Sequence, residues 1–277
     1  GASTRNAGFA CIGSVGELMA DLEIENEEVV KQRIQDRYHG LLLLREVLGD
    51  DNIDYSDCGG WEVFDEPDEF IRLREYVPKL NSIMEEMIGE TQVFEAGTYL
   101  SNPSFFNRVE GQLNPGKMIM TLLNKCIKSG IEFRWNTTIS EIDIQANQIA
   151  AVEGYLFRSD RLIIATNAFT AKILPDIKIK PGRGYAFITN ELALMEWKGT
   201  FHYNNGYVYF RNVGEQRILL GGGRNTAYDD ESTSDFGINE DIKNYLITFA
   251  NEFLVLEQGW KIEQEWSGIM GFTESKS

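Results

Sequence analysis

Residues 115–135 read PGKMIMTLLNKCIKSGIEFRW, and this stretch decides the fold because it encodes a helix that leads straight into a strand. Proline is tolerated in the first turn of a helix and glycine commonly ends one, so Pro115 and Gly130 bracket the predicted helix. The apolar run IEFRW then predicts a buried strand. A helix followed by a buried strand is a building unit of α/β sheets.

Strand patterns continue from this unit to residue 166. The stretches ISEIDIQ (139–145) and QIAAVEG (148–154) alternate as strands do, and YLFRSDR (155–161) predicts a further short strand and turn. LIIAT (162–166) is an uninterrupted apolar run, which is typical of a strand covered on both faces. The pattern predicts a three-stranded meander inserted before a central strand.

The flanking regions predict helices first and antiparallel strands later. Residues 14–48 predict one long acidic helix with a capping-box-like start, residues 55–64 a hairpin and residues 65–88 a second helix. After Pro175 the predicted elements are the strands GYAFIT (184–189), TFHYN (200–204), GYVYFR (206–211) and RILLGGG (217–223), a helix near 240–256, and the strand EQEWSGIMGF (263–272). The run LLGGGR lacks a GK[ST] ending and opens no clear helix, so it predicts a turn and no phosphate cradle.

The charge balance excludes several classes of partner. The 26 Lys and Arg residues against 43 Asp and Glu residues give a net charge of −17, so the surface repels nucleic-acid phosphates and anionic lipid headgroups. No apolar run approaches the roughly 20 residues that a membrane helix needs, and the first residues lack the regions of a secretory signal. We therefore expect a cytoplasmic protein without a nucleic-acid partner or a membrane span.

Metal and nucleophile sites are not predicted. Cys11, Cys58 and Cys126 are widely separated and form no CxxC pair, so they suggest neither a disulfide framework nor a zinc site. His39 and His202 have no partner at the spacing of a metal site or a catalytic triad. We expect these histidines on the surface or in the lining of a cleft.

Several stretches, taken in order, resemble the D-amino-acid-oxidase-like superfamily of FAD-dependent oxidoreductases, which includes glycine and sarcosine oxidases and putrescine-type amine oxidoreductases. They are GASTRNAGF (1–9), EGQLNPGKMIMTLLNKCIKSGIEFRWNTTISEID (110–143), IIATNAF (163–169), PGRGYAFIT (181–189), GYVYFRNVGEQRILLGGGR (206–224) and EWSGIMGFT (265–273). The resemblance covers nearly the whole chain. It implies FAD as cofactor and oxidation of a C–N bond of an amine or amino acid by hydride transfer to the flavin.

One part of the family pattern does not occur. The family begins with a βαβ unit that carries GxGxxG and, about 20 positions on, a carboxylate that holds a ribose. No GxGxxG occurs in this sequence, and the chain opens at the loop that follows that unit. We therefore expect a fragment that is truncated at both ends, inactive by itself and unable to retain FAD. The alternative is a non-catalytic binding or structural module derived from the same fold.

The resemblance also implies the fold class, which is α/β plus α+β. We expect an incomplete FAD/NAD(P)-binding-type doubly wound domain from residues 1–50 and 110–176. We expect the substrate domain, built on a mixed and largely antiparallel sheet, from residues 51–109 and 177–277.

Flavin contacts are implied at three places. They are Ser3, Arg5, Asn6, Ala7 and Gly8 in the first loop, Thr138 and Ile139 on the adenine side, and Ala165, Thr166 and Asn167 at the end of a strand. Open α/β sheets place ligands at the carboxyl ends of their strands, which favours the last group. The alternatives are a disordered N-terminus for the first group and a plain strand end with an asparagine helix cap for the last.

Substrate contacts are implied at Tyr209, Arg183 and Met270. A tyrosine on the strand of Tyr209 often lines the family's substrate cavity, with aromatic packing as the alternative; Arg183 can hold substrate or a structural ion pair. Amino-acid oxidases of the family hold the substrate carboxylate with an arginine in a WxGxRP-like strand, where this chain has Met270. This favours an amine, unless Arg183 or Arg211 holds a carboxylate. No catalytic residue is predicted, because the reaction mainly requires alignment over the flavin.

Overall fold

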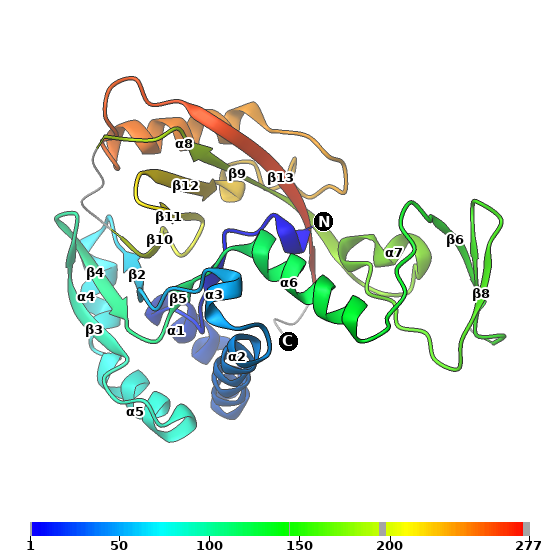
Figure 1. Cartoon of the computed structure of the whole chain (residues 1–277). Helices are drawn as coiled ribbons and strands as arrows, with labels where there is room; N and C mark the ends of the chain where they lie inside the picture. The colour runs from blue at the N-terminus through cyan, green and yellow to red at the C-terminus, as the bar shows by residue number, and fades with distance from the viewer. Residues whose placement is uncertain (1, 144, 194–197, 274–277) are drawn as a thin grey trace.

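The computed structural model describes residues 2–143, 145–193 and 198–273, and its centre is an eight-stranded mixed sheet (Figure 1). Neighbouring strands run antiparallel except β2 and β10, which are parallel. Across the sheet the strands are β13 (Ile262–Phe272), β9 (Lys180–Thr189), β12 (Arg217–Gly222), β11 (Val208–Val213), β10 (Thr200–Tyr203), β2 (Gly60–Val63), β4 (Asn102–Asn107) and β3 (Phe94–Tyr99). The mixed α/β architecture with a large mixed sheet confirms the predicted fold class.

Helices from the first third of the chain form one hydrophobic core with β3 and β4. They are α1 (Val15–Ile24), α2 (Glu27–Leu48), α4 (Pro67–Arg74) and α5 (Val77–Ile88), and the short α3 (Asp50–Ile53) follows α2. Fully buried side chains such as Leu18, Ile34 and Met84 fill this core with Phe105. Burial of their apolar surface is the main stabilising contribution here.

Both helices predicted in this region are in fact divided. Residues 14–48 form two helices because the Asn26 side chain accepts a hydrogen bond from the Glu28 amide at 2.8 Å and starts α2. Residues 65–88 divide where Pro78 enters the first turn of α5. The predicted hairpin at 55–64 is wrong as well. Only β2 forms there, and its partners are the distant strands β4 and β10.

A second core lies under helix α8 (Glu240–Glu252), which packs against the strands after residue 180 (Figure 1). The rings of Phe201 and Phe210 stack at 4.7 Å with an interplanar angle of 6°, and both are fully buried. Phe249 of α8 approaches Phe210 at 5.9 Å. The predicted strands and helix of this half are confirmed, and Gly222 and Gly223 form the predicted turn at φ +111° and +76°.

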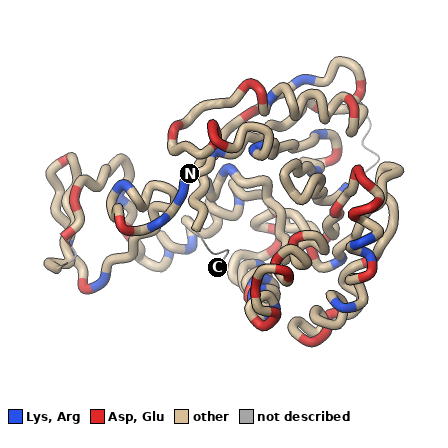
Figure 2. Tube along the Cα trace, turned by 180° about the vertical axis from the view of Figure 1, so that it is seen from behind, with Lys and Arg blue, Asp and Glu red and all other residues tan. Residues whose placement is uncertain are grey.

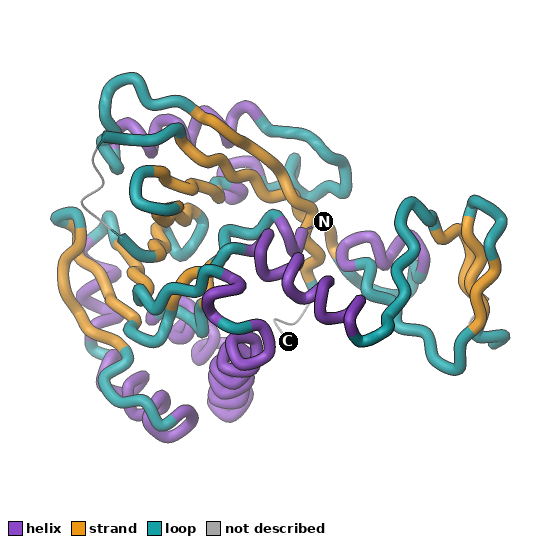
Figure 3. Tube along the Cα trace, in the orientation of Figure 1, coloured by secondary structure: helices purple, strands orange, loops and turns teal. Residues whose placement is uncertain are grey.

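We call residues 115–179 the lobe and the rest of the molecule the body. Helix α6 of the lobe packs against α3 of the body, and the part of the lobe after α6 projects from the body (Figures 1 and 3). The lobe contains α6 (Pro115–Lys128), β6 (Ile139–Asp143), β7 (Gln148–Ala151), β8 (Leu156–Arg158), the 3-10 turn η2 (Asn167–Phe169) and α7 (Thr170–Ile173). Strands β6, β7 and β8 pair in this order, which confirms the predicted meander.

Two predicted strands of the lobe are not strands in the structure. Residues 131–135 and 162–166 have irregular backbone and pair with no strand of the described part of the chain. Trp135 is 66% exposed and Ile163 is 87% exposed, whereas Leu162 and Ile164 are half-buried. A strand is stable only when neighbours take up its N–H and C=O groups, so an apolar sequence without a neighbour stays irregular.

The predicted division into two domains stays a prediction. The segments 51–109 and 177–277 share the eight-stranded sheet, as expected of one unit. However, residues 12–34 pack on the core of that unit, although we expected them with the flavin-type part. Acidic residues occur along the body and the lobe alike (Figure 2). Within the described ranges, no helix combines the length and the apolar character of a membrane span.

Candidate functional site

A row of side chains across one face of the sheet forms the floor of the main cavity. Register pairing aligns Trp266 with Ala186, Ala186 with Gly221, Gly221 with Tyr209, and Tyr209 with His202. Paired residues point to the same face, so these side chains form one surface. Gly221 leaves room for the Tyr209 ring, since a Cβ on Gly221 would lie 2.6 Å from ring atoms. The cavity has a volume of about 370 Å³.

The first loop of the chain forms the opposite wall. The Phe9 ring meets the His202 ring edge-on at 5.0 Å. The Arg5 guanidinium donates to the Ser267 carbonyl at 2.6 Å, and the Trp266 indole donates back to the Arg5 carbonyl at 2.8 Å. These bonds tie the loop to β13, so the wall of the cavity is ordered by the sheet and requires no ligand.

Arg211 also holds the first loop in place through hydrogen bonds. Its guanidinium is buried and donates to the carbonyls of Ala7 at 2.5 Å and Leu113 at 3.2 Å, and to the Gln112 side chain at 3.3 Å. Burial lowers the pKa of Arg211 to about 10. Its donors serve these acceptors, so Arg211 has a structural role and is not placed to take a substrate carboxylate.

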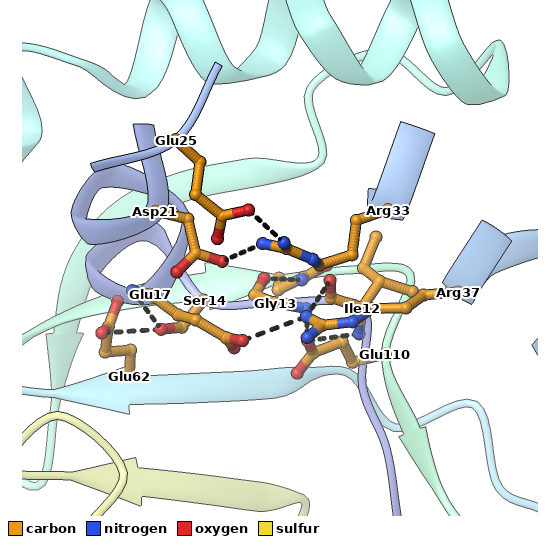
Figure 4. A network of polar contacts seen from close by, with 11 residues as sticks. Ile12, Gly13, Ser14, Glu17, Asp21, Glu25, Arg33, Arg37, Glu62 and Glu110 are labelled. Atoms are coloured by element: carbon orange, nitrogen blue, oxygen red, sulfur yellow. Dashed lines mark hydrogen bonds and ion pairs between the residues drawn. The ribbon is translucent and has the colours of Figure 1, made fainter. Parts of the chain in front are cut away.

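Buried carboxylates anchor the segment that follows this loop (Figure 4). Glu62 accepts from the Ser14 hydroxyl at 2.8 Å and from the Gly16 amide at 2.9 Å. Glu110 accepts from the amide of Ile12 at 3.1 Å. Burial raises the pKa of Glu62 to about 7 and that of Glu110 to about 8. Neither carboxylate forms an ion pair with a residue in the described ranges.

Sequence patterns did not indicate this pair, because contacts between distant parts of the chain bring Glu62 and Glu110 to the segment after the loop. Ion pairs hold the helices beside it. Arg33 contacts Asp21 at 2.7 Å and Glu25 at 2.6 Å. Arg37 contacts Glu17 at 3.1 Å (Figure 4).

The predicted substrate residues divide into two groups. Tyr209 and Met270 line the main cavity, and Met270 is 38% exposed there. Arg183 does not line it. Its guanidinium forms two hydrogen bonds to the Glu231 carboxylate, at 2.7 Å and 2.9 Å. This agrees with the alternative prediction that Arg183 forms a structural ion pair. A contact between Arg183 and substrate therefore has no geometric support.

The predicted flavin residues do not meet in one place. Arg5, Asn6, Ala7 and Gly8 line the main cavity. Ser3 lies beside them, and its carbonyl accepts from the Asn6 side chain at 2.7 Å. The others lie in the lobe, outside this cavity; they are Thr138, Ile139, Ala165, Thr166 and Asn167.

Two of these positions have structural explanations that involve no ligand. Gly8 has φ +77°, and a Cβ there would lie 2.2 Å from the Leu113 carbonyl, so the backbone itself requires glycine. The Thr138 amide donates to the Glu153 carboxylate at 3.2 Å and is therefore already occupied. The adenine contact predicted for Thr138 gains no support from this arrangement.

Sequence reasoning placed His202 on a surface or in a cleft, and the structure places it in the cavity lining, whereas His39 is exposed on α2. It did not identify Phe9 or Trp266 as walls of the cavity. No group of three or more His, Cys, Asp or Glu residues suited to a metal occurs among the described residues.

The profile of the FAD dependent oxidoreductase family (DAO) matches residues 1–276. The chain belongs to this family. A search of curated proteins found no match. The family assignment confirms the resemblance inferred from the sequence.

Solved structures show the same fold. Glycine oxidase from Geobacillus kaustophilus aligns with a TM-score of 0.73 and 17% identity, covering 99% of this chain and 74% of that one. Iminodiacetate oxidase from Chelativorans sp. BNC1 aligns with a TM-score of 0.75 and 13% identity, covering 99% of this chain and 75% of that one. L-amino acid deaminase from Proteus myxofaciens aligns with a TM-score of 0.72 and 11% identity, covering 98% of this chain and 72% of that one.

The residues present fit only part of the family's cofactor. The loop 5–9 and the sheet floor enclose a largely apolar space of the kind that accepts a planar ring. The sequence contains no GxGxxG turn for a pyrophosphate. The lining is therefore suited in kind to a planar ring, and the sequence contains no such turn for the phosphates.

Proposed function

We propose that this chain forms the substrate-binding body of an FAD-dependent oxidoreductase that oxidises a C–N bond of an amine or amino acid. The observation that carries the proposal is the main cavity between loop 5–9 and the row from Trp266 to His202. When bound, FAD would supply the hydride acceptor. A small substrate and a location in the cytoplasm belong to the same proposal.

The residues of the chain would position the substrate and exclude water. Tyr209, Trp266 and Phe9 give apolar walls that hold a carbon chain in place. Alignment of the reacting carbon is the largest contribution such a site can make, because it converts a bimolecular encounter into a positioned one. The Tyr209 hydroxyl stays protonated, since burial raises its pKa to about 12, and can donate a hydrogen bond.

We further propose that an amine is preferred over the matching amino acid. Met270 lines the cavity where the family's carboxylate-binding arginine is expected. Arg5 also lines it, but one of its donors already serves the Ser267 carbonyl. Leaving a carboxylate without a full partner in a closed site is unfavourable by several kcal/mol.

The experiment saturates the chain with added FAD and follows anaerobic bleaching of the flavin by butylamine and by 2-aminopentanoate, its α-carboxylated counterpart. We expect faster bleaching by the amine. Met270→Arg should shift the ratio of the two rates toward the amino acid by tenfold or more, about 1.4 kcal/mol. Met87→Arg on α5, outside the lining of the cavity, is the control.

A wild-type preference for the amino acid would contradict the amine assignment and point to Arg5. The rival function is a non-catalytic binding or structural module derived from the same fold. Failure of FAD to bind even in large excess would support that rival.

A further inference from the structure

His202 occupies a junction between three cavities. On the sheet it pairs with Tyr209 of β11 on one side and with Glu62 of β2 on the other. It lines the main cavity and also a polar cavity of about 220 Å³ that Glu17 borders. A third space of about 10 Å³, enough for one water, separates it from Glu62 and Glu110.

The imidazole of His202 has no hydrogen-bond partner among residues 2–143, 145–193 and 198–273. Phe9 covers its ring edge-on. Gly206 borders both the main and the polar cavity, and a Cβ on it would lie 3.6 Å from Nδ1 of His202. A side chain on residue 206 would therefore begin to cover this nitrogen.

The surroundings keep the ring neutral. Burial lowers the pKa of His202 to about 4, while Glu17 of α1 acts in the opposite direction. The carboxyls of Glu62 and Glu110 lie across the smallest cavity. A neutral imidazole accepts hydrogen bonds through one of its nitrogens.

The other polar groups in the main cavity cannot take this role. Arg5 carries a positive charge, which repels an ammonium group. The Tyr185 hydroxyl already donates to Glu265 at 2.5 Å. Tyr209 is a protonated phenol at neutral pH. Among the described residues of this lining, His202 is the one neutral nitrogen base.

We propose that His202 binds the amino nitrogen of the substrate, and that its unprotonated ring nitrogen accepts a hydrogen bond from the ammonium group. The proposal rests on the proposed function. The proton stays on the amine, because a buried imidazole with a pKa of about 4 is a much weaker base than an alkylamine. His202 is therefore a positioning residue that fixes where the amino nitrogen lies in the main cavity.

The test uses the whole chain without cofactor and butylamine as the probe. The chain has two histidines, so ¹⁵N spectra of the imidazole rings contain two sets of signals, which His202→Gln and His39→Gln assign. We expect butylamine to shift the His202 signals and to leave those of His39 in place. Butanol and butyrate, which have similar chains and no amine, should leave the His202 signals unchanged.

Affinity gives the second readout. His202→Gln should weaken butylamine binding by about tenfold, as expected for loss of one hydrogen bond to a charged group. His39→Gln should bind as the wild type does. Unshifted His202 signals at saturating or high millimolar butylamine would overturn the proposal, as would equal shifts with butanol. This wild-type measurement decides even if His202→Gln does not fold.

The inference and the proposed function fail separately. If butylamine shifts the His202 signals but never bleaches added FAD, the amine site is supported and the enzymatic function is rejected. If butylamine bleaches FAD while the His202 signals stay unchanged, the function is supported and the role of His202 is rejected.

Discussion

The body and the lobe both carry many apolar residues but use them differently. In the body, two cores bury side chains such as Phe105 and Phe210 almost completely. In the lobe, Trp135, Leu156 and Ile163 are each more than 60% exposed, and the buried hydrophobic residues are few. Apolar sequence alone therefore does not produce a core; it needs partner elements that cover it from the other side.

The pairing of strands also differs between the body and the lobe. Each strand of the body sheet has a partner that the chain itself supplies, including the parallel pairing of β2 with β10 across about 140 residues. The apolar segments 131–135 and 162–166 have no such partner in the described ranges. Figure 3 shows loop where those strands were predicted.

The largest expected effect follows from this contrast in burial. Phe210→Ala should destabilise the protein by about 3–5 kcal/mol, because it leaves a cavity under α8 beside the stacked Phe201 ring. Trp135→Ala in the lobe removes a larger ring and should change stability by no more than about 0.5 kcal/mol. Urea unfolding of both variants measures this. Equal losses would show that the lobe is as well packed as the body.

Sequence reasoning succeeded where an element and its partner are neighbours in the chain. Strands β10, β11 and β12 and the β6–β8 meander pair with the next strand along the chain, so their alternating pattern was sufficient. It failed at 162–166, where an apolar run implied a partner that the described chain does not supply.

The site was predictable to a similar extent. Tyr209 and Met270 could be placed because each lies on a strand with a recognisable pattern. The acids Glu62 and Glu110 could not, because long-range register makes them neighbours and their residue type predicts a surface position.

The pH dependence of stability should come from the body. The pKa of Glu110 is raised from 4.5 to about 8 in the folded state, so the unfolded state loses this proton first. Stability therefore falls as the pH rises toward 8. Between about pH 6.5 and 8, Glu110 should lower the stability of the wild type by up to about 1.4 kcal/mol per pH unit, and Glu110→Gln should lack this contribution. His202 stays neutral when folded over this range.

Glu153→Gln in the exposed part of the lobe is the matched control and should leave the pH slope unchanged. Unfolding free energies measured at several pH values give the slopes. A Glu110→Gln variant with the wild-type slope would mean that Glu110 is ionised in the folded protein throughout.

A smaller effect distinguishes two arginines. Arg211→Lys keeps the charge but cannot reproduce the fork of bonds to Ala7 and Leu113, so a loss of about 1–2 kcal/mol is expected. The exposed Arg158 of the lobe donates to the Gln148 side chain at 2.9 Å, and Arg158→Lys should be nearly neutral. Thermal unfolding compares the two. A neutral Arg211→Lys would show that loop 5–9 is held by its contacts to Ser267 and Trp266 alone.

The smallest expected signal is the flavin absorbance of the purified chain, which we predict to be absent. The body offers a cavity that fits a ring, but tight retention of FAD also requires contacts to its phosphates and ribose. The chain has no GxGxxG turn, and the Thr138 amide of the lobe is already bonded to Glu153. Because the phosphates carry most of the cofactor's charge, a ring pocket alone should bind FAD weakly and release it during purification. An absorbance scan of the purified chain, repeated after incubation with FAD and gel filtration, measures this. A stoichiometric flavin band after gel filtration would show that the exposed apolar lobe and the body together form a complete cofactor site, and the contrast between them would then describe only the state without cofactor.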